Sequence, residues 1–337
     1  MDYRSAAREV AKSGARPVYV CYGTEKYLIR EFIQYITDKL IDPDVRDFAI
    51  SRHDFSETSL EAVLEDAQTL PFMAEKKLVI AKSAIFLTGA KDTSKVEHNT
   101  EKLLEYLKSP CEFSVLILLV DADKLDERKK VVKALKECAI AFPVLNAEDL
   151  LQWVKRQAER HSFSFADGAA DQTVLYAGSN LQTLSAELDK LSLYVGSGGV
   201  VTGDIVEQLV TRSTEQNVFI LIEDIVRLRL QRAFTILHEL IKMKEEPVKL
   251  TLLIARQFRI ILQVKESMKL GYSQQQLAGQ LGLHPYAVKV AAEQGSRYTD
   301  EQLTRILTEL AELDYKMKSG KIDKVLGLEL FLLQLSA

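Results

Sequence analysis

The feature that most restricts how this chain can fold is a change of sequence pattern near residue 145. Before it, runs of β-branched and aromatic residues alternate with segments whose apolar residues recur at helical spacing, which predicts β-α units around a parallel sheet. After it, nearly every segment has helical periodicity alone. The chain has 337 residues, whereas one domain typically has about 100 to 200. We therefore expect an α/β part followed by an all-α part.

Residues 1–142 are predicted to form the α/β domain. The strand-like runs are VYVCYG, KKLVIAKSAIFL and FSVLILLVDAD. The helix-like segments between and after them are EKYLIREFIQYITDKL, EKLLEYLKS and ERKKVVKALKECA. One more helix is expected after Thr58, because Thr58 and Glu61 have the spacing of a capping box.

Residues 143–212 are predicted to form a small helical lid domain, and residues 213–337 a helical bundle. The lid helices are expected in DLLQWVKRQAERH, AADQTVLYAGS, NLQTLSAELDKLSLYVG and VTGDIVEQLV. The bundle helices are expected at 215–242, 247–270, 273–281, 284–293, 299–318 and 323–335. Pro247 suits a first helical turn, and Ser273 with Gln276 and Thr299 with Gln302 have the pattern of capping boxes.

Charge and cysteine content narrow the class of protein. The formal net charge is -4, made up of -7 in residues 1–210 and +3 in residues 211–337. The chain therefore lacks the overall basic excess that is typical of a nucleic-acid-binding protein. Three widely spaced cysteines argue against a disulfide framework. The amino terminus lacks a signal-peptide pattern, and no apolar run approaches the 18 to 20 residues that span a membrane. We expect a cytoplasmic protein without membrane contact.

The passage VYVCYGTEKYLIREF stands where a nucleotide-binding α/β domain carries its phosphate loop. It contains one glycine, Gly23, and no G-x-x-x-x-G-K-[ST] motif. Without a second glycine the backbone cannot wrap phosphates, and without Lys followed by Ser or Thr the phosphate-binding cation and the magnesium-binding hydroxyl are missing. We therefore expect no ATP binding or hydrolysis by this chain, and we interpret Lys26 as a solvated helix residue.

No catalytic, cofactor or metal site is predicted elsewhere. Asp121 and Asp123 follow an apolar strand, as magnesium-holding carboxylates do, but in the absence of a phosphate loop we interpret them as capping or loop residues. Cys138 has no histidine positioned by sequence to activate it. None of the histidines has metal-ligand spacing. They are His53, His98, His161, His238 and His284.

Four apolar residues, Leu70, Pro71, Phe72 and Met73, stand at a helix-to-strand turn where polar residues are expected. We call this group the apolar turn. Two interpretations are open: it is either the edge of the domain core or an exposed wedge. If it is exposed, burial of two or three of its side chains in a partner contributes about 4 to 7 kcal/mol, at about 1.5 to 3 kcal/mol each.

A second pattern has the residue spacing of a helix-turn-helix. It covers residues 273–294, with Ala278 and Gly282 at tight positions and Val288 behind them. The face that would read bases offers His284, Tyr286, Lys289 and Glu293, without Arg or Asn. Packing inside a helical bundle is the favoured interpretation, and a helix-turn-helix DNA-binding regulator is the alternative function.

The order of segments along the chain resembles that of the delta subunit of bacterial DNA polymerase III, a component of the sliding-clamp loader. The segments that carry the resemblance are VYVCYGTEKYLI, TLPFMAEKKLVIAK, LQTLSAELDKLSLY, VTGDIVEQLV, NVFILIEDIV, QFRIIL, GLHPYAVKVA, LAELDYKMKSGKID and LGLELFLLQL. The resemblance implies an AAA+-like parallel α/β domain without a functional phosphate loop, a small helical lid domain, and a helical collar that joins related subunits.

The resemblance also implies a role for the apolar turn. In this family an apolar pair in the first domain enters a pocket on the sliding clamp, and here the pair falls on Pro71 and Phe72, flanked by Leu70 and Met73. Proline at the first place departs from the Leu-Phe pair of the best-known member, so Phe72 is the expected anchor.

The function implied is that of a clamp-loader subunit in DNA replication, which binds the sliding clamp (the beta subunit) and opens its ring. Expected partners are ATPase and delta-prime-type subunits in a hetero-pentamer, with primed DNA inside the assembly. The chain would belong to a DNA-directed DNA polymerase, a nucleotidyltransferase, by membership of the complex and without catalysis or cofactors of its own.

Overall fold

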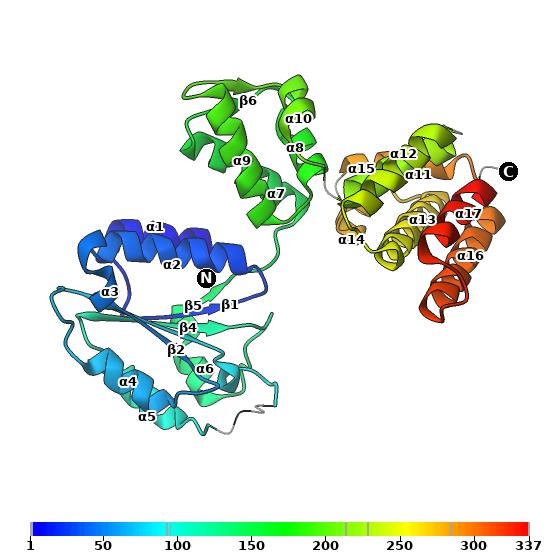
Figure 1. Ribbon diagram of the computed structural model, residues 1–337. Coiled ribbons are helices and arrows are strands. Elements are labelled where there is room, and N and C mark those ends of the chain that lie inside the picture. The colour runs from blue at the N-terminus through cyan, green and yellow to red at the C-terminus, as the bar shows by residue number, and fades with distance from the viewer. Residues whose placement is uncertain are drawn as a thin grey trace. The chain divides into compact units, whose positions relative to one another are not determined.

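The computed structural model describes residues 3–91, 94, 96–212, 214–227, 229–283 and 285–335 (Figure 1). The chain divides into two compact units, Met1–Leu145 and Asn146–Ala337. Two predicted features, His284 and the boundary residue Ser213, lie outside the described residues. No helix within the described ranges is long and apolar enough to cross a membrane.

The first unit is built on a five-stranded parallel sheet in the order β2-β3-β4-β1-β5. Its strands are β1 (Val18–Tyr22), β2 (Ile50–Asp54), β3 (Lys77–Lys82), β4 (Ser114–Val120) and β5 (Ala139–Ala141). The central strand β4 is apolar along its length because it is covered on both faces.

Helices cover both faces of this sheet (Figure 1). They are α1 (Tyr3–Ser13), α2 (Lys26–Leu40), α3 (Arg46–Ala49), α4 (Leu60–Gln68), α5 (Thr100–Tyr106) and α6 (Lys130–Ala134). The helices α1 and α2 lie on one face, where Phe32 packs edge-on against Tyr19, and α4, α5 and α6 lie on the other. Short 3-10 turns occur at Pro43–Val45, Ile85–Leu87 and Lys136–Cys138.

The second unit begins with four helices that contact one another, together with a short parallel pair of strands. These elements are α7 (Ala147–Arg160), β6 (Ser164–Phe165), α8 (Ala169–Ala177), α9 (Leu181–Val195), β7 (Val200–Val201) and α10 (Gly203–Leu209). Asn146 and Asn180 cap α7 and α9 with their side-chain oxygens, which explains where these two helices begin.

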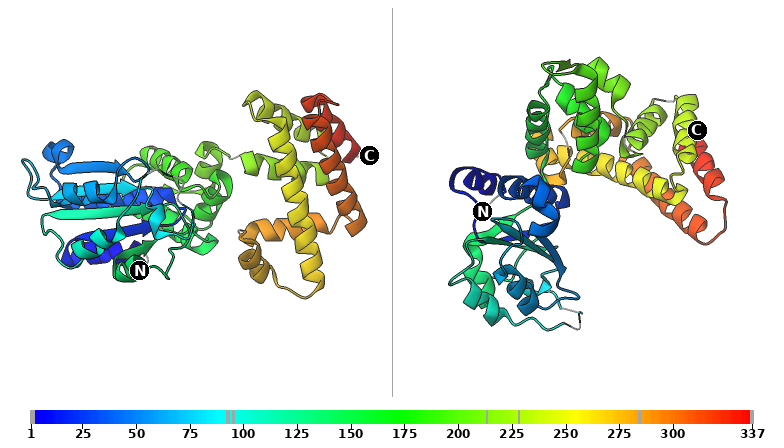
Figure 2. Two further views of the ribbon diagram at one scale, coloured as in Figure 1. Left: turned by 90° about the horizontal axis from the view of Figure 1, so that it is seen from below. Right: turned by 60° about the vertical axis from the view of Figure 1, so that its left-hand side comes forward.

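Seven further helices share one apolar core around the long helix α13 (Figure 2). They are α11 (Thr214–Val226), α12 (Leu230–Lys242), α13 (Pro247–Lys269), α14 (Gln274–Leu281), α15 (Pro285–Gly295), α16 (Asp300–Lys318) and α17 (Lys324–Leu335). Pro247 stands in the first turn of α13, and both predicted capping boxes, at Ser273 and Thr299, are confirmed.

The predicted fold class, a parallel α/β part followed by an all-α part, is confirmed. The predicted boundary at residue 142 lies three residues from the end of the first unit. The further division at residue 212 stays a prediction, because the contacts group residues 146–337 into one unit.

Several predicted elements are wrong in detail. The helix expected in ERKKVVKALKECA ends at Ala134, and its last residue, Ala139, begins the edge strand β5. The strand expected in KKLVIAKSAIFL ends at Lys82, because Ser83 takes a left-handed backbone conformation (φ 64°). Helix α4 is capped by Ser59 instead of Thr58, so no capping box forms there. The elements α1, α3, β2, β6 and β7 were not predicted.

The single helix predicted at 215–242 is two helices, α11 and α12. Asp224, which is fully buried near the end of α11, lies 2.7 Å from the Arg229 guanidinium and 3.5 Å from that of Arg232. The Arg229 amide also donates to the Asp224 carbonyl. A buried carboxylate requires such partners, and here they come from Arg229, directly before α12, and from Arg232 in the first turn of α12.

Candidate functional site

The carboxyl edge of the sheet is where α/β proteins place their ligands. There, β1 leads through Gly23 into α2. Gly23 has φ 136°, and a Cβ atom on it would stand 2.1 Å from the Phe142 carbonyl oxygen. That same carbonyl oxygen accepts a hydrogen bond from the Glu25 amide (3.1 Å). Glycine is therefore required at position 23 because the backbone at Phe142 passes close to it. The Glu25 amide, which a phosphate would otherwise use, already donates to the Phe142 carbonyl.

The amino terminus of α2 already has an anion of its own. The Glu25 carboxylate caps the helix by accepting a hydrogen bond from the Tyr27 amide (3.1 Å). A helix amino terminus favours negative charge, and Glu25 provides it, so an incoming phosphate would meet a carboxylate. The residues present here do not fit a nucleotide phosphate group.

The charged residues around this loop are paired at the surface. Lys26 is exposed, as expected of a solvated helix residue, and its ammonium lies 2.7 Å from a carboxylate oxygen of Asp121. The Thr24 hydroxyl donates to Asp123 (3.3 Å). These contacts give Asp121 and Asp123 the loop roles that were expected of them.

The apolar turn lies at the opposite, amino edge of the same sheet. It follows α4 and leads into β3 at Lys77. Leu70, Phe72 and Met73 are 73%, 66% and 71% exposed, whereas Pro71 is partly buried. Their exposure is inconsistent with the interpretation of this group as the edge of the domain core. The described part of the first unit carries most of its large exposed apolar side chains here.

The two ends of the apolar turn are braced by a partly buried ion pair. The Lys77 ammonium, on a side chain that is 8% exposed, lies 2.5 Å from a carboxylate oxygen of Asp66 and also donates to the Asp66 carbonyl (2.8 Å). The second Asp66 carboxylate oxygen lies 2.9 Å from His53 Nε2 on β2. This network joins the last turn of α4 to the first residue of β3 and fixes the span of the turn between them.

The environment of Asp66 favours its ionised form. Burial alone raises the pKa of this carboxyl, but hydrogen bonds from Lys77, His53 and Ser51 outweigh burial, and the net pKa lies below its ordinary value. Met73, the last residue of the apolar turn, has φ 56°, a left-handed conformation that costs a non-glycine residue about 1 to 2 kcal/mol. Strain of this kind persists only where neighbouring contacts hold the backbone in place.

One exposed aromatic residue beside the apolar turn was missed in the sequence. Phe48, on α3, is 59% exposed, and its ring lies edge-on to that of Phe72 with centroids 6.1 Å apart. The signal that could have found it is the pairing of β2 with β3, which brings the segments leading into both strands to one edge. That pairing requires β2 to be recognised as a strand, and β2 is short and lacks an apolar run.

The helix-turn-helix-like segment packs inside the bundle. Ala278 and Val288 are buried in the core that surrounds α13, and Gly282 forms the turn in a left-handed conformation (φ 62°). Lys289 and Glu293 are exposed, whereas His284 lies outside the described residues. The packing interpretation of this segment is therefore supported by the burial of its apolar residues.

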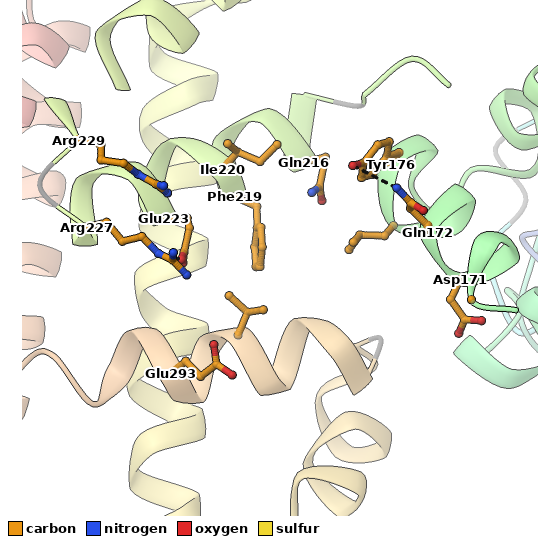
Figure 3. Close-up of a pocket in the computed structure, with 13 residues that line it drawn as sticks. Asp171, Gln172, Tyr176, Gln216, Phe219, Ile220, Glu223, Arg227, Arg229 and Glu293 are labelled. Carbon is orange, nitrogen blue, oxygen red and sulfur yellow. Dashed lines mark hydrogen bonds and ion pairs between the residues drawn. The ribbon is translucent and has the colours of Figure 1, made fainter. Parts of the chain in front are cut away.

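A pocket of about 660 Å³ in the second unit is lined by residues of α8, α11 and α15 (Figure 3). Its charged side chains neutralise one another in part: Glu223 pairs with Arg227, and Arg229 pairs with Asp224 behind the wall. Asp171 and Glu293 add two further acidic groups. The lining has no basic excess that would attract a phosphate, and we assign no ligand to it.

No catalytic or metal centre emerges from the part of the chain that the structure describes. No group of three or more His, Cys, Asp or Glu side chains there could hold a metal ion. Burial raises the pKa of the Cys138 thiol, although Arg16 partly opposes this effect. A raised pKa reduces the fraction of thiolate, which is the nucleophilic form.

Comparison with known proteins identifies the family. The family model described as "DNA polymerase III, delta subunit" matches residues 19–144, and the model described as "DNA polymerase III delta subunit, C-terminal domain" matches residues 215–335. The DNA polymerase III subunit delta of Bacillus subtilis is 41% identical over 330 residues, covering 97% of this chain and 95% of that protein.

Two further comparisons agree. A probable DNA polymerase III subunit delta of Aquifex aeolicus is 23% identical over 239 residues, covering 69% of this chain and 66% of that protein. The solved structure of the Bacillus subtilis DNA clamp loader delta protein superposes with a TM-score of 0.71 at 40% identity, covering 99% of each chain. On this evidence the chain belongs to the delta-subunit family of DNA polymerase III, the family of a clamp-loader subunit of DNA replication.

Proposed function

We propose that this chain binds the sliding clamp through the apolar turn and holds the clamp ring open for loading onto primed DNA. The observation that carries the proposal is the exposure of Leu70, Phe72 and Met73 on a turn whose two ends are fixed by Asp66 and Lys77. The family of the chain supplies the class of partner, since the relative of known structure is named a DNA clamp loader protein.

The energy available from the apolar turn suits a protein-protein contact. Burial of a large apolar side chain contributes about 1.5 to 3 kcal/mol, so Leu70, Phe72 and Met73 together offer about 4.5 to 9 kcal/mol before the cost of association. The largest single share is expected from Phe72, because aromatic side chains are enriched among the residues that dominate interface energetics. Pro71 is only partly exposed and contributes less.

Opening of a closed ring follows from differential affinity. A ligand shifts an equilibrium between closed and open forms only by the ratio of its affinities for the two. The apolar turn therefore has to bind more tightly to the clamp when the neighbouring ring interface is distorted. Fixed ends suit a turn in this role, because a turn whose ends moved freely would adapt to both forms.

ATP hydrolysis is assigned to other subunits of the assembly. In this chain the Phe142 carbonyl and the Glu25 carboxylate occupy the place of a phosphate loop, which supports a subunit that keeps the α/β shape without nucleotide chemistry. The chain is thus part of a nucleotidyltransferase, the polymerase holoenzyme, without catalysis of its own.

The proposed collar, residues 213–337, joins this chain to ATPase and delta-prime-type subunits in a hetero-pentamer around primed DNA. Helix α17 supports this role, because it is apolar on both sides: Leu328 and Leu332 are buried, while Leu326 and Leu330 are exposed. A helix that is apolar all round normally packs on two sides. We place this assembly in the cytoplasm, at the replisome.

The substitution Phe72→Asp tests the clamp contact. We expect it to weaken binding of the full chain to the cognate sliding clamp by at least a hundredfold, because it replaces an anchor by a charge that the apolar pocket cannot solvate. Binding is measured by surface plasmon resonance, with circular dichroism as a check of the fold. Because Phe72 is exposed, the fold itself is expected to be unaffected, and unchanged clamp affinity would overturn the proposal.

A further inference from the structure

We propose that Phe48 is a second anchor of the clamp-contact surface and holds Phe72 in its binding orientation. This inference rests on the proposed function of the apolar turn. It adds a residue from a different segment of the chain, α3, so two segments instead of one form the contact surface.

The sheet topology places Phe48 beside Phe72. The parallel strands β2 and β3 pair with Ile50 opposite Leu78, so the segments that lead into both strands meet at the amino edge of the sheet. Phe48 precedes β2 and Phe72 precedes β3. Their rings lie at an interplanar angle of 68° with centroids 6.1 Å apart, which is the edge-to-face arrangement that aromatic pairs prefer.

Both rings remain available to a partner despite this contact. Phe48 is 59% exposed and Phe72 is 66% exposed, so the pair covers less than half of either side chain. A pair formed only to stabilise the domain would bury more of its area, because burial is the source of the stabilisation. Leu70 and Met73, which flank Pro71 and Phe72 in the sequence, are exposed as well, so Phe48 adds to the apolar area that the turn offers.

The segment that carries Phe48 is held in place from both ends. Arg46, at the start of α3, donates to Asp38 on α2 (2.6 Å), and Ala49, which follows Phe48, is fully buried. Phe48 therefore projects from a fixed backbone. In contrast, the described amides of residues 70–76 donate no hydrogen bond to another backbone carbonyl.

The consequence is that Phe72 depends on a side-chain neighbour for its orientation. A ring fixed before binding loses less conformational freedom on binding, and this gain appears as affinity. The ring of Phe48 also offers area of its own to the apolar pocket of the clamp. The loss of Phe48 should thus weaken clamp binding both directly and through Phe72.

A double-mutant cycle with the full chain and the cognate sliding clamp tests the inference. We expect Phe48→Ala to weaken clamp binding about tenfold and Phe72→Ala about a hundredfold. In the Phe72→Ala background, Phe48→Ala should have a smaller effect than it has alone, since contacting residues are coupled. Tyr194→Ala, which removes an exposed aromatic side chain (60%) from α9, is the matched control and should leave affinity unchanged.

The outcomes separate this inference from the proposed function. If Phe72→Ala weakens binding while Phe48→Ala does not, the role of Phe48 is overturned and the clamp contact stands. Additive losses overturn the coupling to Phe72. If neither variant changes affinity, the clamp contact itself fails. The thermal midpoint of Phe48→Ala should equal that of the unmodified chain, and a lowered midpoint with unchanged affinity would assign Phe48 to stability alone.

Discussion

Single residues give the two edges of the parallel sheet opposite properties. At the carboxyl edge, Gly23 and Glu25 turn the polar groups of the β1–α2 loop inward, where the Phe142 carbonyl satisfies one of them. At the amino edge, Phe48 and Phe72 turn apolar area outward. The carboxyl edge therefore has few unpaired polar groups with which to bind a ligand. The amino edge has exposed apolar surface, and its removal from water is favourable.

Asp66 is the residue on which the position of the apolar turn depends. We expect Asp66→Asn to lower the free energy of unfolding by about 2 to 3 kcal/mol at pH 7, because it leaves the Lys77 ammonium buried without a counter-charge. Chemical denaturation followed by circular dichroism measures this change. Glu101→Gln, which removes the exposed pair of Glu101 with Lys130, is the control and should cause a much smaller loss.

The same residue gives stability a defined dependence on pH. The pKa of Asp66 is lower in the folded protein than its ordinary value, so its contribution is fully present above the unfolded pKa, near 4. The contribution is lost as the pH falls through the folded pKa. The difference in stability between the unmodified chain and Asp66→Asn should therefore narrow below about pH 4. A constant difference from pH 7 to pH 3 would contradict this account.

At the scale of elements, local capping chemistry sets where the bundle helices begin. The Thr299 hydroxyl accepts from the Gln302 amide (3.1 Å), and the Gln302 side chain accepts from the Thr299 amide (2.7 Å). These two bonds satisfy amides at the start of α16 that lack a partner within the helix. The contact at the end of α11 is also local in sequence, because Asp224 pairs with Arg229 only five residues further along the chain.

We expect Thr299→Ala to lower the free energy of unfolding by about 1 kcal/mol, the usual cost of removing a capping hydroxyl. The matched control is Thr308→Ala in the same helix, where the exposed hydroxyl only donates back to the Thr304 carbonyl (3.0 Å). Alanine is the better helix former at such a position, so this variant should be as stable as the unmodified chain or slightly more so. Equal losses in both variants would show that capping is not the cause.

At the scale of the whole molecule, the chain is two compact units with a short connection. Residues 143–146 have no regular secondary structure, and Val144 is 62% exposed. The apolar turn belongs to the first unit and the proposed collar to the second. The clamp contact and the subunit contacts are therefore expected to be carried by separately folded parts.

Limited proteolysis with elastase tests this organisation. The first cut is expected at residues 143–146, because exposed connections between units are the preferred sites of cleavage, and mass spectrometry should find fragments that match Met1–Leu145 and Asn146–Ala337. Val144→Asp, which removes the aliphatic side chain that elastase prefers, should slow this cut. A first cut inside the α/β unit would contradict the two-unit organisation. A later cut near residue 212 would support the predicted lid–collar boundary.

The fold was predictable where the sequence signal is local. Helices with capping residues and strands with long apolar runs, such as β4 and α13, were found within a few residues of their true ends. The short elements α3, β2 and β5 were missed or mistaken for helix. Four residues in α3 and three in β5 are too few for a period to be recognised, and β2, although as long as β1, has one apolar residue where β1 has an apolar run. The same limit hid Phe48, whose position depends on β2.

The sequence by itself determined the fold class, the absence of a phosphate-loop motif and the group of apolar residues at 70–73, because all three are patterns of neighbouring residues. Only the tertiary structure decided that Leu70, Phe72 and Met73 face solvent, that Asp66 and Lys77 brace them, and that Phe48 lies against Phe72. The physical reason is that exposure and contact depend on which distant segments the sheet pairs, and β2 pairs with β3 across a whole intervening helix.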